Sequence, residues 1–257
     1  MKKIENLEVS EILDIVNNTA DQYIVNIGCG NAVLDDPLAP LIKKNIGGLY
    51  IDQQQGHIEN CKKNVNPLIT AFQSHVTPDN IKTSFSTNNV PKDIDILKLD
   101  IDGYDLAVLK SILDEDYRPK IIMSEFNEKI PPQIHFDTFF SEDYVWDTSH
   151  FYGYSLLAGK DLEKYGYYIA SLYDKNNILY IHKDYSDLFK ITESADLDHI
   201  YKTQYLPHAF YYNKNVAHWA QIDDVTELSN AIISFFEGIG HNIDEYYINP
   251  NPRNDSE

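Results

Sequence analysis

Asp95-Ile96-Leu97-Lys98-Leu99-Asp100-Ile101-Asp102-Gly103-Tyr104-Asp105 is the stretch of the chain that decides its fold. A mostly apolar run that ends in turn residues is typical of a strand buried in a parallel sheet. The pattern therefore predicts a central strand, with Asp100 and Asp102 at or just beyond its carboxyl end. That edge is where open α/β sheets bind their ligands. The alternative is that the two aspartates only cap the helix predicted over residues 106–113.

Two further predicted strands end in residues suited to a nucleotide-like ligand. Residues 23–31 predict a buried strand that breaks into the turn Gly28-Cys29-Gly30, and glycine lets a backbone turn tightly beside a ligand. Val33 stands where a dinucleotide fingerprint has its third glycine, which argues against a nicotinamide cofactor. A second predicted strand ends in Asp52, 24 residues beyond Gly28 and near the ~20 expected of a ribose-binding carboxylate. The alternative role of Asp52 is the N-cap of a helix around residues 58–63.

Strands and helices alternate along most of the chain. Helices are predicted over residues 8–18 and after Asp35-Asp36-Pro37, where an N-cap precedes a first-turn proline. Further strands are predicted over residues 66–73 and 120–127, followed by a closing pair at 164–171 and 177–182. This order predicts an α/β fold: a Rossmann-like doubly wound sheet, mostly parallel with an antiparallel edge strand, and helices on both faces.

The predicted organisation is a main domain with a C-terminal extension. The domain covers residues 1–183, with its core from about residue 23, and residues 130–156 form a substrate loop or lid. Long loops inside a compact domain are usually functional, although a packed ornament is the alternative. Residues 184–257 form a helical extension, with a helix over 227–237 and an acidic tail from about Asn249 that we expect to be disordered. The sequence does not specify whether the extension caps the site or mediates a homodimer.

Composition excludes several partners. The chain has 257 residues and a formal net charge of -19, with 40 acidic against 21 basic side chains. Such a field repels nucleic-acid phosphates and anionic membranes, so neither is an expected partner. Membrane insertion is not expected either, because no window approaches the roughly 18 apolar residues of a span. The start of the chain lacks the apolar core of a signal peptide, and Cys29 and Cys61 form neither a disulfide framework nor a metal motif. The expected location is the cytoplasm.

The ordered set of Asn26-Ile27-Gly28-Cys29-Gly30, Asp52 and the central motif resembles class I S-adenosylmethionine-dependent methyltransferases. Lys98, Asp100, Asp102, Gly103 and Asp105 make the central motif most similar to the FkbM branch, whose members often methylate hydroxyls of sugars and polyketide glycosides. The resemblance spans about residues 23–183 and includes Glu125-Phe126-Asn127, Pro131-Pro132 and residues 151–156. Two departures are Asn26 in place of the usual acid and Asn31 in place of a frequent third glycine.

The resemblance implies a role for each site residue. S-adenosyl-L-methionine would be the cofactor, held by residues at four strand ends: Asn26, Gly28, Cys29, Gly30, Asp52, Gln53, Ser74 and Asp100. A neutral hydroxyl is a poor nucleophile, so a base or a metal is needed. Asp100, Asp102 or His150 could be the general base. Alternatively Asp100, Glu125 and Asn127 could bind Mg²⁺ through hard oxygen ligands.

The expected reaction is O-methylation of a small-molecule or glycan acceptor, specifically a hydroxyl of a sugar or sugar-derived precursor of a surface polysaccharide. One alternative is a non-catalytic S-adenosylmethionine-binding or scaffold protein, and another is a methyltransferase for a non-sugar small molecule. A nicotinamide-dependent sugar oxidoreductase is disfavoured by Val33 and by the lack of a Tyr-x-x-x-Lys pattern after the fifth predicted strand.

Overall fold

The computed structural model describes residues 3–146, 150–174, 176–209 and 214–249. Its nine strands in these ranges are β1 (Tyr23–Ile27), β2 (Gly47–Asp52), β3 (Ile69–Gln73), β4 (Ile96–Leu99), β5 (Ile121–Glu125), β6 (His135–Thr138), β7 (Tyr167–Tyr173), β8 (Asn177–His182) and β9 (Tyr246–Asn249).

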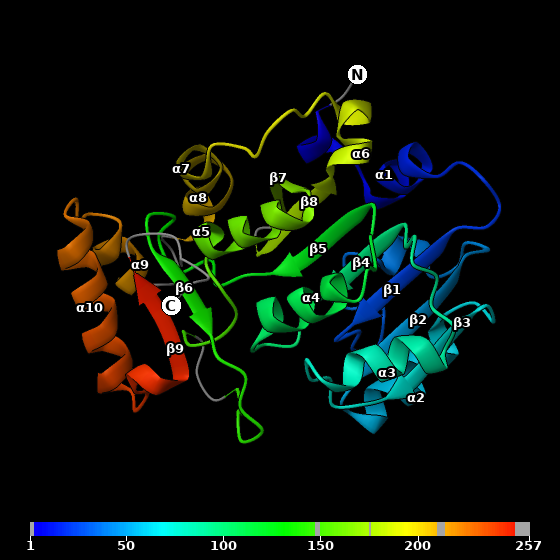
Figure 1. Cartoon of the computed structure of the whole chain (residues 1–257), viewed down its shortest axis with the longest axis horizontal. Helices are drawn as coiled ribbons and strands as arrows, with labels where there is room; N and C mark the ends of the chain where they lie inside the picture. The colour runs from blue at the N-terminus through cyan, green and yellow to red at the C-terminus, as the bar shows by residue number, and fades with distance from the viewer. Residues whose placement is uncertain (1–2, 147–149, 175, 210–213, 250–257) are drawn as a thin grey trace.

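Seven of these strands form one twisted sheet in the order β3-β2-β1-β4-β5-β8-β7 (Figure 1). The pairs from β3 to β5 are parallel, whereas β8 is antiparallel to both β5 and β7. The chain runs outward from β1 to β3 and then returns to place β4 beside β1. That reversal between β1 and β4 is the switch point at which doubly wound sheets bind ligands. The predicted fold class is confirmed.

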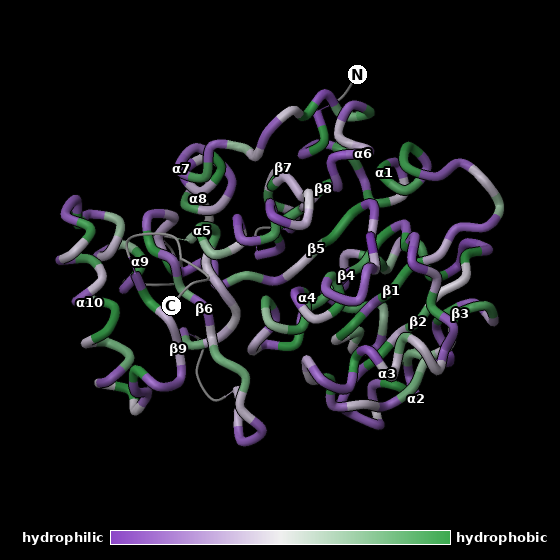
Figure 2. The backbone as a smooth tube through the Cα atoms, viewed as in Figure 1, coloured by the Kyte–Doolittle hydropathy of each residue, from purple (hydrophilic) through white to green (hydrophobic). Residues whose placement is uncertain are grey.

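Helices cover both faces of this sheet, and alternating strand residues fill two cores. On one face Val25 and Leu97 pack with α3 and α4, and on the other Ile24 and Ile96 pack with α1 and α2. Figure 2 shows the apolar positions concentrated along the strands and on the inner sides of the helices. The helices are α1 (Val9–Val16), α2 (Gln55–Asn64), α3 (Asn80–Thr87), α4 (Asp105–Asp114), α5 (Leu156–Gly159), α6 (Lys183–Ser186), α7 (Leu197–Ile200), α8 (Leu206–Ala209), α9 (Lys214–Trp219) and α10 (Val225–Gly238).

The helix expected after Asp35-Asp36-Pro37 is absent, and that prediction was wrong. Between β1 and β2 the described chain forms turns and one short 3₁₀ helix, Ala39–Leu41. Pro37 and Pro40 remove two backbone donors within four residues, which prevents a regular helical hydrogen-bond ladder. Asp35 also has a positive φ of 52°, outside the helical region.

A small second sheet joins two distant parts of the chain. Within the segment predicted as a loop, β6 pairs antiparallel with β9 of the C-terminal extension. Phe136 of β6, Phe151, Phe236 of α10 and Tyr246 of β9 share a third apolar core. The loop segment and the extension therefore fold together, although the division of the chain at residue 183 stays a prediction. The expected disordered tail falls mostly on residues 250–257, outside the described residues.

Among the residues that the structure describes, no helix combines the length and apolar character needed to cross a membrane.

Candidate active site

The glycine turn after β1 is packed on one side and open on the other. Gly28 has a φ of +73°, and a Cβ there would lie 1.6 Å from the backbone oxygen of Asp100. The N–H groups of Gly28 and Cys29 donate to the carbonyl of Ile51 at 2.8 and 3.1 Å, tying the turn to the end of β2. Gly30 has a φ of +50°, and no atom lies within 4 Å of the place of a Cβ. The turn is thus held against β4 while Gly30 faces open space.

Asp52 at the end of β2 holds this turn in place. Its Oδ2 accepts the N–H of Gly30 at 2.8 Å, and its Oδ1 accepts the N–H of Gln54 at 2.8 Å. Oδ1 also lies 3.1 Å from Nδ1 of His57. The N-cap of α2 is Gln54, so Asp52 is not the cap residue that the alternative interpretation required. Its carboxylate instead links the two loops that border the switch point.

Gln53 and Ser74 lie next to Asp52, at the ends of neighbouring strands. Asp52 is paired with Gln73 in the sheet, and the N–H of Ser74 donates to the carbonyl of Asp52 at 2.9 Å. The carbonyl of Gln53 accepts from Nε2 of Gln73 at 3.0 Å. The structure therefore brings together the three residues that were predicted at this flank of the site.

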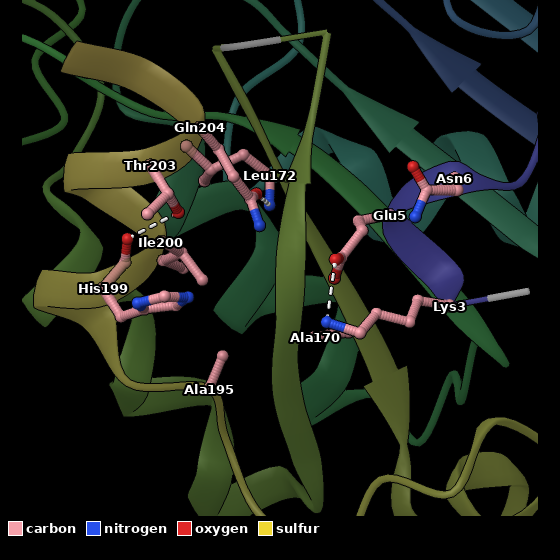
Figure 3. A pocket seen from close by; sticks show the side chains of 10 residues that line it. All are labelled: Lys3, Glu5, Asn6, Ala170, Leu172, Ala195, His199, Ile200, Thr203 and Gln204. Atoms are coloured by element: carbon pink, nitrogen blue, oxygen red, sulfur yellow. Dashed lines mark hydrogen bonds and ion pairs between the residues drawn. The ribbon is translucent and has the colours of Figure 1, made fainter. Parts of the chain in front are cut away.

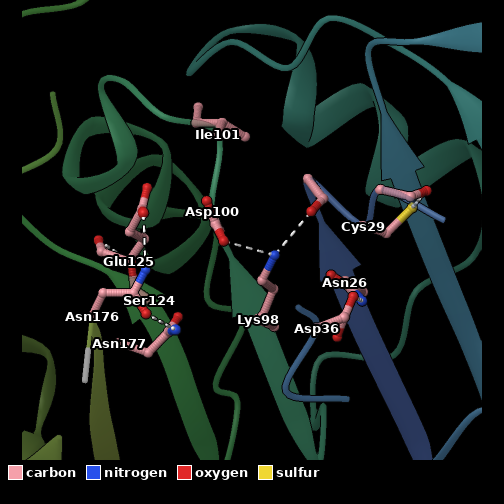
Figure 4. Close-up of polar contacts among 12 residues, drawn as sticks. Asn26, Cys29, Asp36, Lys98, Asp100, Ile101, Ser124, Glu125, Asn176 and Asn177 are labelled. Carbon is pink, nitrogen blue, oxygen red and sulfur yellow. Dashed lines mark hydrogen bonds and ion pairs between the residues drawn. The ribbon is translucent and has the colours of Figure 1, made fainter. Parts of the chain in front are cut away.

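Lys98 connects the glycine turn to the central motif. Its Nζ donates to the carbonyl of Gly28 at 2.9 Å and lies 3.1 Å from Oδ2 of Asp100, and its side chain is only 3% exposed (Figure 4). Burial alone would lower the pKa of Lys98, but the carboxylates of Asp100 and Asp36 reverse that effect and raise it. Lys98 is therefore a buried cation. The sequence signal was a lysine inside an otherwise apolar strand, since such a residue needs a charged partner.

Asp36, in the segment between β1 and β2, forms a hydrogen bond with Asn26, the first residue of the glycine motif. Nδ2 of Asn26 donates to Oδ2 of Asp36 at 2.7 Å, and Oδ1 of Asp36 accepts the N–H of Leu38 at 2.7 Å. Asn26 thus binds a carboxylate instead of supplying one. Asp36 was not among the predicted site residues, because it lies ten positions further along and its expected role was a helix cap.

Three carboxylates meet where β4 and β5 end. One oxygen from each of Asp100, Asp102 and Glu125 lies within 4.8 Å of the others. Asp102 is exposed and has a positive φ of 56°, whereas Glu125 is buried with 7% exposure. Burial and the charge of Asp100 raise the pKa of both Asp102 and Glu125. Like-charge repulsion in this group is therefore substantial.

Asp105 holds the backbone turn between Asp100 and Gly103, which carries two of these carboxylates. Its carboxylate accepts the N–H of Ile101 at 2.9 Å and that of Gly103 at 3.0 Å, which fixes the turn that carries Asp102. Burial raises the pKa of Asp105 to about 7.

Asn127 and His150 serve the loop rather than this cluster. Nδ2 of Asn127 donates to the carbonyls of His150 and Tyr152 at 2.8 and 3.0 Å, and its Oδ1 accepts the N–H of Lys129 at 3.2 Å. The imidazole of His150 lies against the ring of Phe235 in α10, with 5.1 Å between centroids. The predicted metal ligands were Asp100, Glu125 and Asn127. In the described part of the chain, the group that the structure brings together contains Asp102 in place of Asn127.

The segment predicted as a lid does lie on the central motif. The hydroxyl of Tyr144 donates to the carbonyl of Asp102 at 2.8 Å, and its ring packs against Gly103. The N–H of Gly153 donates to the carbonyl of Gly103 at 2.6 Å. Beyond Tyr144, the side chain of Trp146 is 51% exposed. The ring of Tyr144 therefore lies beside the turn that carries Asp102.

A separate cavity of about 550 Å³ lies between the amino-terminal 3₁₀ helix (Ile4–Asn6), β7 and α7 (Figure 3). It is lined by residues such as Glu5, Leu172 and His199 and by none of the predicted site residues. It lies at the far edge of the sheet from the glycine turn, so it is not part of the candidate site.

Comparison with known proteins identifies the family. A model of the FkbM methyltransferase domain matches residues 16–156, which is more than half of the chain. No curated protein matches the sequence. The chain resembles a solved S-adenosylmethionine-dependent methyltransferase from Aquifex aeolicus at 14% identity, with a TM-score of 0.39 over 69% of this chain and 90% of that chain. A TehB-like methyltransferase from Corynebacterium glutamicum is similar at 12% identity, with a TM-score of 0.40 and the same coverage of 69% and 90%. Monomeric WbdD is similar at 12% identity, with a TM-score of 0.43 over 68% of this chain and 40% of that one.

The family match and the strand order of the sheet define the protein as a class I S-adenosylmethionine-dependent methyltransferase with a Rossmann-like α/β fold. Within that class, the chain belongs to the FkbM methyltransferase family. The resemblance carried by the central motif is confirmed, and S-adenosyl-L-methionine is the methyl donor that the family implies.

Proposed function

We propose that the protein transfers the methyl group of S-adenosyl-L-methionine to a hydroxyl of a sugar or sugar-derived precursor of a surface polysaccharide. One observation carries the proposal: Lys98 joins the glycine turn directly to Asp100, so a cofactor on the turn would lie beside the carboxylate group. Methyl transfer is an in-line displacement, so catalysis depends on bringing an acceptor oxygen to the sulfonium methyl and removing its proton.

The residues around the turn fit this cofactor. The open space at Gly30 would accept its methionine part, beside Cys29. In this proposal Asp52 would bind the ribose hydroxyls, and Gln53 and Ser74, at the neighbouring strand ends, would flank the adenine. The bound cofactor supplies an electrophilic methyl group. These residues would hold it, and the ion pair of Lys98 with Asp100 would fix the Asp100 carboxylate beside it.

Asp102 is the general base that the surroundings favour. The carboxylate of Asp100 is engaged by Lys98, and the imidazole of His150 is packed on Phe235. Among the described residues Asp102 forms no ion pair, and partial burial and the charge of Asp100 raise its pKa, with Lys98 opposing them only in part. Asp102 is therefore a suitable proton acceptor. Asp102 therefore accepts the proton of the acceptor hydroxyl in this proposal.

The acceptor class rests on the surroundings of the carboxylates. Carboxylates bind sugar hydroxyls, and Tyr144 and Trp146 offer rings that could cover a polar ring and exclude water. A net charge of -19 disfavours nucleic acid. Two free, buried cysteines are in keeping with the cytoplasm as its location, where thiols stay reduced.

The test is transfer of labelled methyl groups to a panel of nucleotide-sugars, free glycans and catechols. We expect a methyl ether on a sugar oxygen. Asp102→Asn should lower kcat by about 100-fold or more, the usual scale for loss of a general base, without changing S-adenosylhomocysteine affinity. Glu142→Gln, an exposed change in the neighbouring segment, is the control and should retain full activity.

Three outcomes would contradict the proposal. Methylation of nitrogen or carbon would overturn the reaction, and transfer only to catechols would identify a non-sugar acceptor. Cofactor binding without transfer to any acceptor would favour the scaffold alternative.

A further inference from the structure

The carboxylate group at the ends of β4 and β5 carries more negative charge than its neighbours balance. Asp100, Asp102 and Glu125 each bring one carboxylate, and the ion pair recorded for this group in the described chain is Lys98 with Asp100. Two formal negative charges remain over a few ångströms. Such charges repel strongly in a partly buried site, where the effective dielectric constant is below that of water.

Glu125 gives a second, independent indication of a ligand. Its Oε1 accepts from Nδ2 of Asn176 at 3.2 Å, whereas its Oε2 is buried and has no hydrogen-bond partner among the residues that the structure describes. Glu125 lies at the end of β5, and one of its oxygens lies within 4.8 Å of oxygens of Asp100 and Asp102. A buried carboxylate oxygen without a donor is costly, so it requires a proton or a cation.

We propose that Asp100, Asp102 and Glu125 together bind a divalent cation with hard ligand preferences. This inference rests on the proposed function and deepens it, since the ion would lie at the acceptor side of the same site. The ligand set differs from the one predicted from sequence, because the Asn127 side chain is committed to the loop at His150 and Tyr152.

The spacing of the oxygens indicates which cations fit. In an octahedral shell, opposite oxygens are about 4.2 Å apart for Mg²⁺ and about 4.8 Å apart for Ca²⁺, from metal–oxygen distances of about 2.1 and 2.4 Å. The three oxygens lie within 4.8 Å of one another. A limit of 4.8 Å between every pair is compatible with one divalent ion of either size once the carboxylates adjust around it. Asp102 is exposed, so its side chain can make that adjustment.

Three protein ligands leave coordination positions for water or for the acceptor. Mg²⁺-type ions usually keep such positions for substrate oxygens. A cation here would orient a pair of acceptor hydroxyls and lower the pKa of the one to be methylated. One oxygen of Asp102 would bind the ion, and its second oxygen would remain available to accept the proton of that hydroxyl. The charge of the site would fall from two formal negative charges to none.

The test uses the full chain and Mn²⁺ alone, with free ion measured by its electron paramagnetic resonance signal. We expect one site per chain with a dissociation constant below about 1 mM at pH 7.5, displaced by Mg²⁺ or Ca²⁺. Asp102→Asn should weaken binding at least tenfold. It is the safest ligand variant, because Asn tolerates a φ of 56° as well as Asp does. Glu125→Gln should have the same effect, while Glu142→Gln should bind Mn²⁺ like the unmodified chain.

Calorimetry with S-adenosylhomocysteine on the same samples separates this inference from the proposed function. A chain that binds the nucleoside but no Mn²⁺ between pH 6 and 8.5 overturns the cation site and leaves the methyltransferase proposal intact. Undiminished Mn²⁺ binding by both Asp102→Asn and Glu125→Gln would place the ion elsewhere and would also overturn it. If the chain binds no Mn²⁺, a proton shared between Glu125 and Asp100 would supply the hydrogen bond that Oε2 of Glu125 lacks.

Discussion

The two sides of the candidate site are built in opposite ways. The cofactor side consists of β1, β2 and β4 with their loops, and backbone hydrogen bonds such as Gly28 to Ile51 fix its turn. The region that we propose to border the acceptor, here called the acceptor side, consists of β6, β9 and α10, which lie together at the other end of the molecule in Figure 1. Its core is made of aromatic side chains from segments about 100 residues apart, with Phe236 in contact with Phe136, Phe151 and Tyr246.

This difference separates what local sequence specifies from what long-range packing specifies. A turn held by its own backbone tolerates almost no change of side chain. An aromatic core between distant segments tolerates the exchange of one large apolar side chain for another, but it loses stability each time a ring is removed. We therefore expect the two sides to respond differently to substitution.

The largest effect is expected from Gly28→Ala. The added Cβ would overlap the backbone oxygen of Asp100 at 1.6 Å, and a φ of +73° is itself unfavourable for alanine. S-adenosylhomocysteine affinity, measured by calorimetry, should fall by about 100-fold or more, which corresponds to about 2.8 kcal/mol. Gly56→Ala is the control, because nothing lies within 4 Å of its Cβ position, and it should bind normally. Normal binding by Gly28→Ala would show that the turn is not rigid.

Phe236→Ala should affect the acceptor side alone. Removing a fully buried phenylalanine costs about 3–5 kcal/mol, and its three aromatic neighbours lose their common partner. Hydrogen exchange should show loss of protection in β6 and β9 and a fall in acceptor turnover, with S-adenosylhomocysteine affinity within twofold of normal. Phe85→Ala makes an equivalent cavity under α3 and should instead destabilise the main sheet. Loss of cofactor binding in Phe236→Ala would mean that both sides unfold as one unit.

Asp52→Ala tests how much one carboxylate on the cofactor side contributes to cofactor binding. Its carboxylate would no longer accept from Gly30 and Gln54, nor bind the ribose. S-adenosylhomocysteine binding should weaken by about 1.5–3 kcal/mol, the scale of hydrogen bonds to a charged group. His57→Ala removes an exposed neighbour of the same carboxylate and should cost much less. Equal losses in both variants would point to a general electrostatic effect rather than to direct contact.

The smallest effect is expected from Tyr144→Phe, at the contact between the two sides. The variant loses the hydrogen bond from the hydroxyl to the carbonyl of Asp102 and keeps the ring on Gly103. A loss of about 1 kcal/mol should raise the KM for the acceptor about fivefold, with kcat changed less. Tyr168→Phe in β7, away from the site, is the matched control. A change in kcat alone would assign Tyr144 to chemistry rather than to placement of the lid.

The sequence predicted the strand ends around the glycine turn well because their signals are local. The apolar run 95–99, the glycine turn and Asp52 each specify a strand end within a few residues, and the sheet then brings those ends together. Asp100 and Glu125 were correctly placed at one edge by the same logic. The pairing of β6 with β9 could not be predicted, because each is only four residues long and its partner is more than 100 positions away. His150 and Asn127 have the chemistry of site residues, and only their long-range contacts show that they hold the loop.

Edge strand β7 has a consequence for association between copies of the chain. Its backbone groups are already occupied by the start of the C-terminal extension: the carbonyl of Ile169 accepts from Ala195 at 2.7 Å, and the N–H of Leu172 donates to Gln204 at 2.8 Å. Ser194 takes the N–H of Ile169 at 3.0 Å. An edge blocked in this way cannot template another strand, which protects the sheet from edge-to-edge aggregation. If two copies of the chain join their seven-stranded sheets in a dimer, they would therefore pair through β3, the strand at the opposite edge.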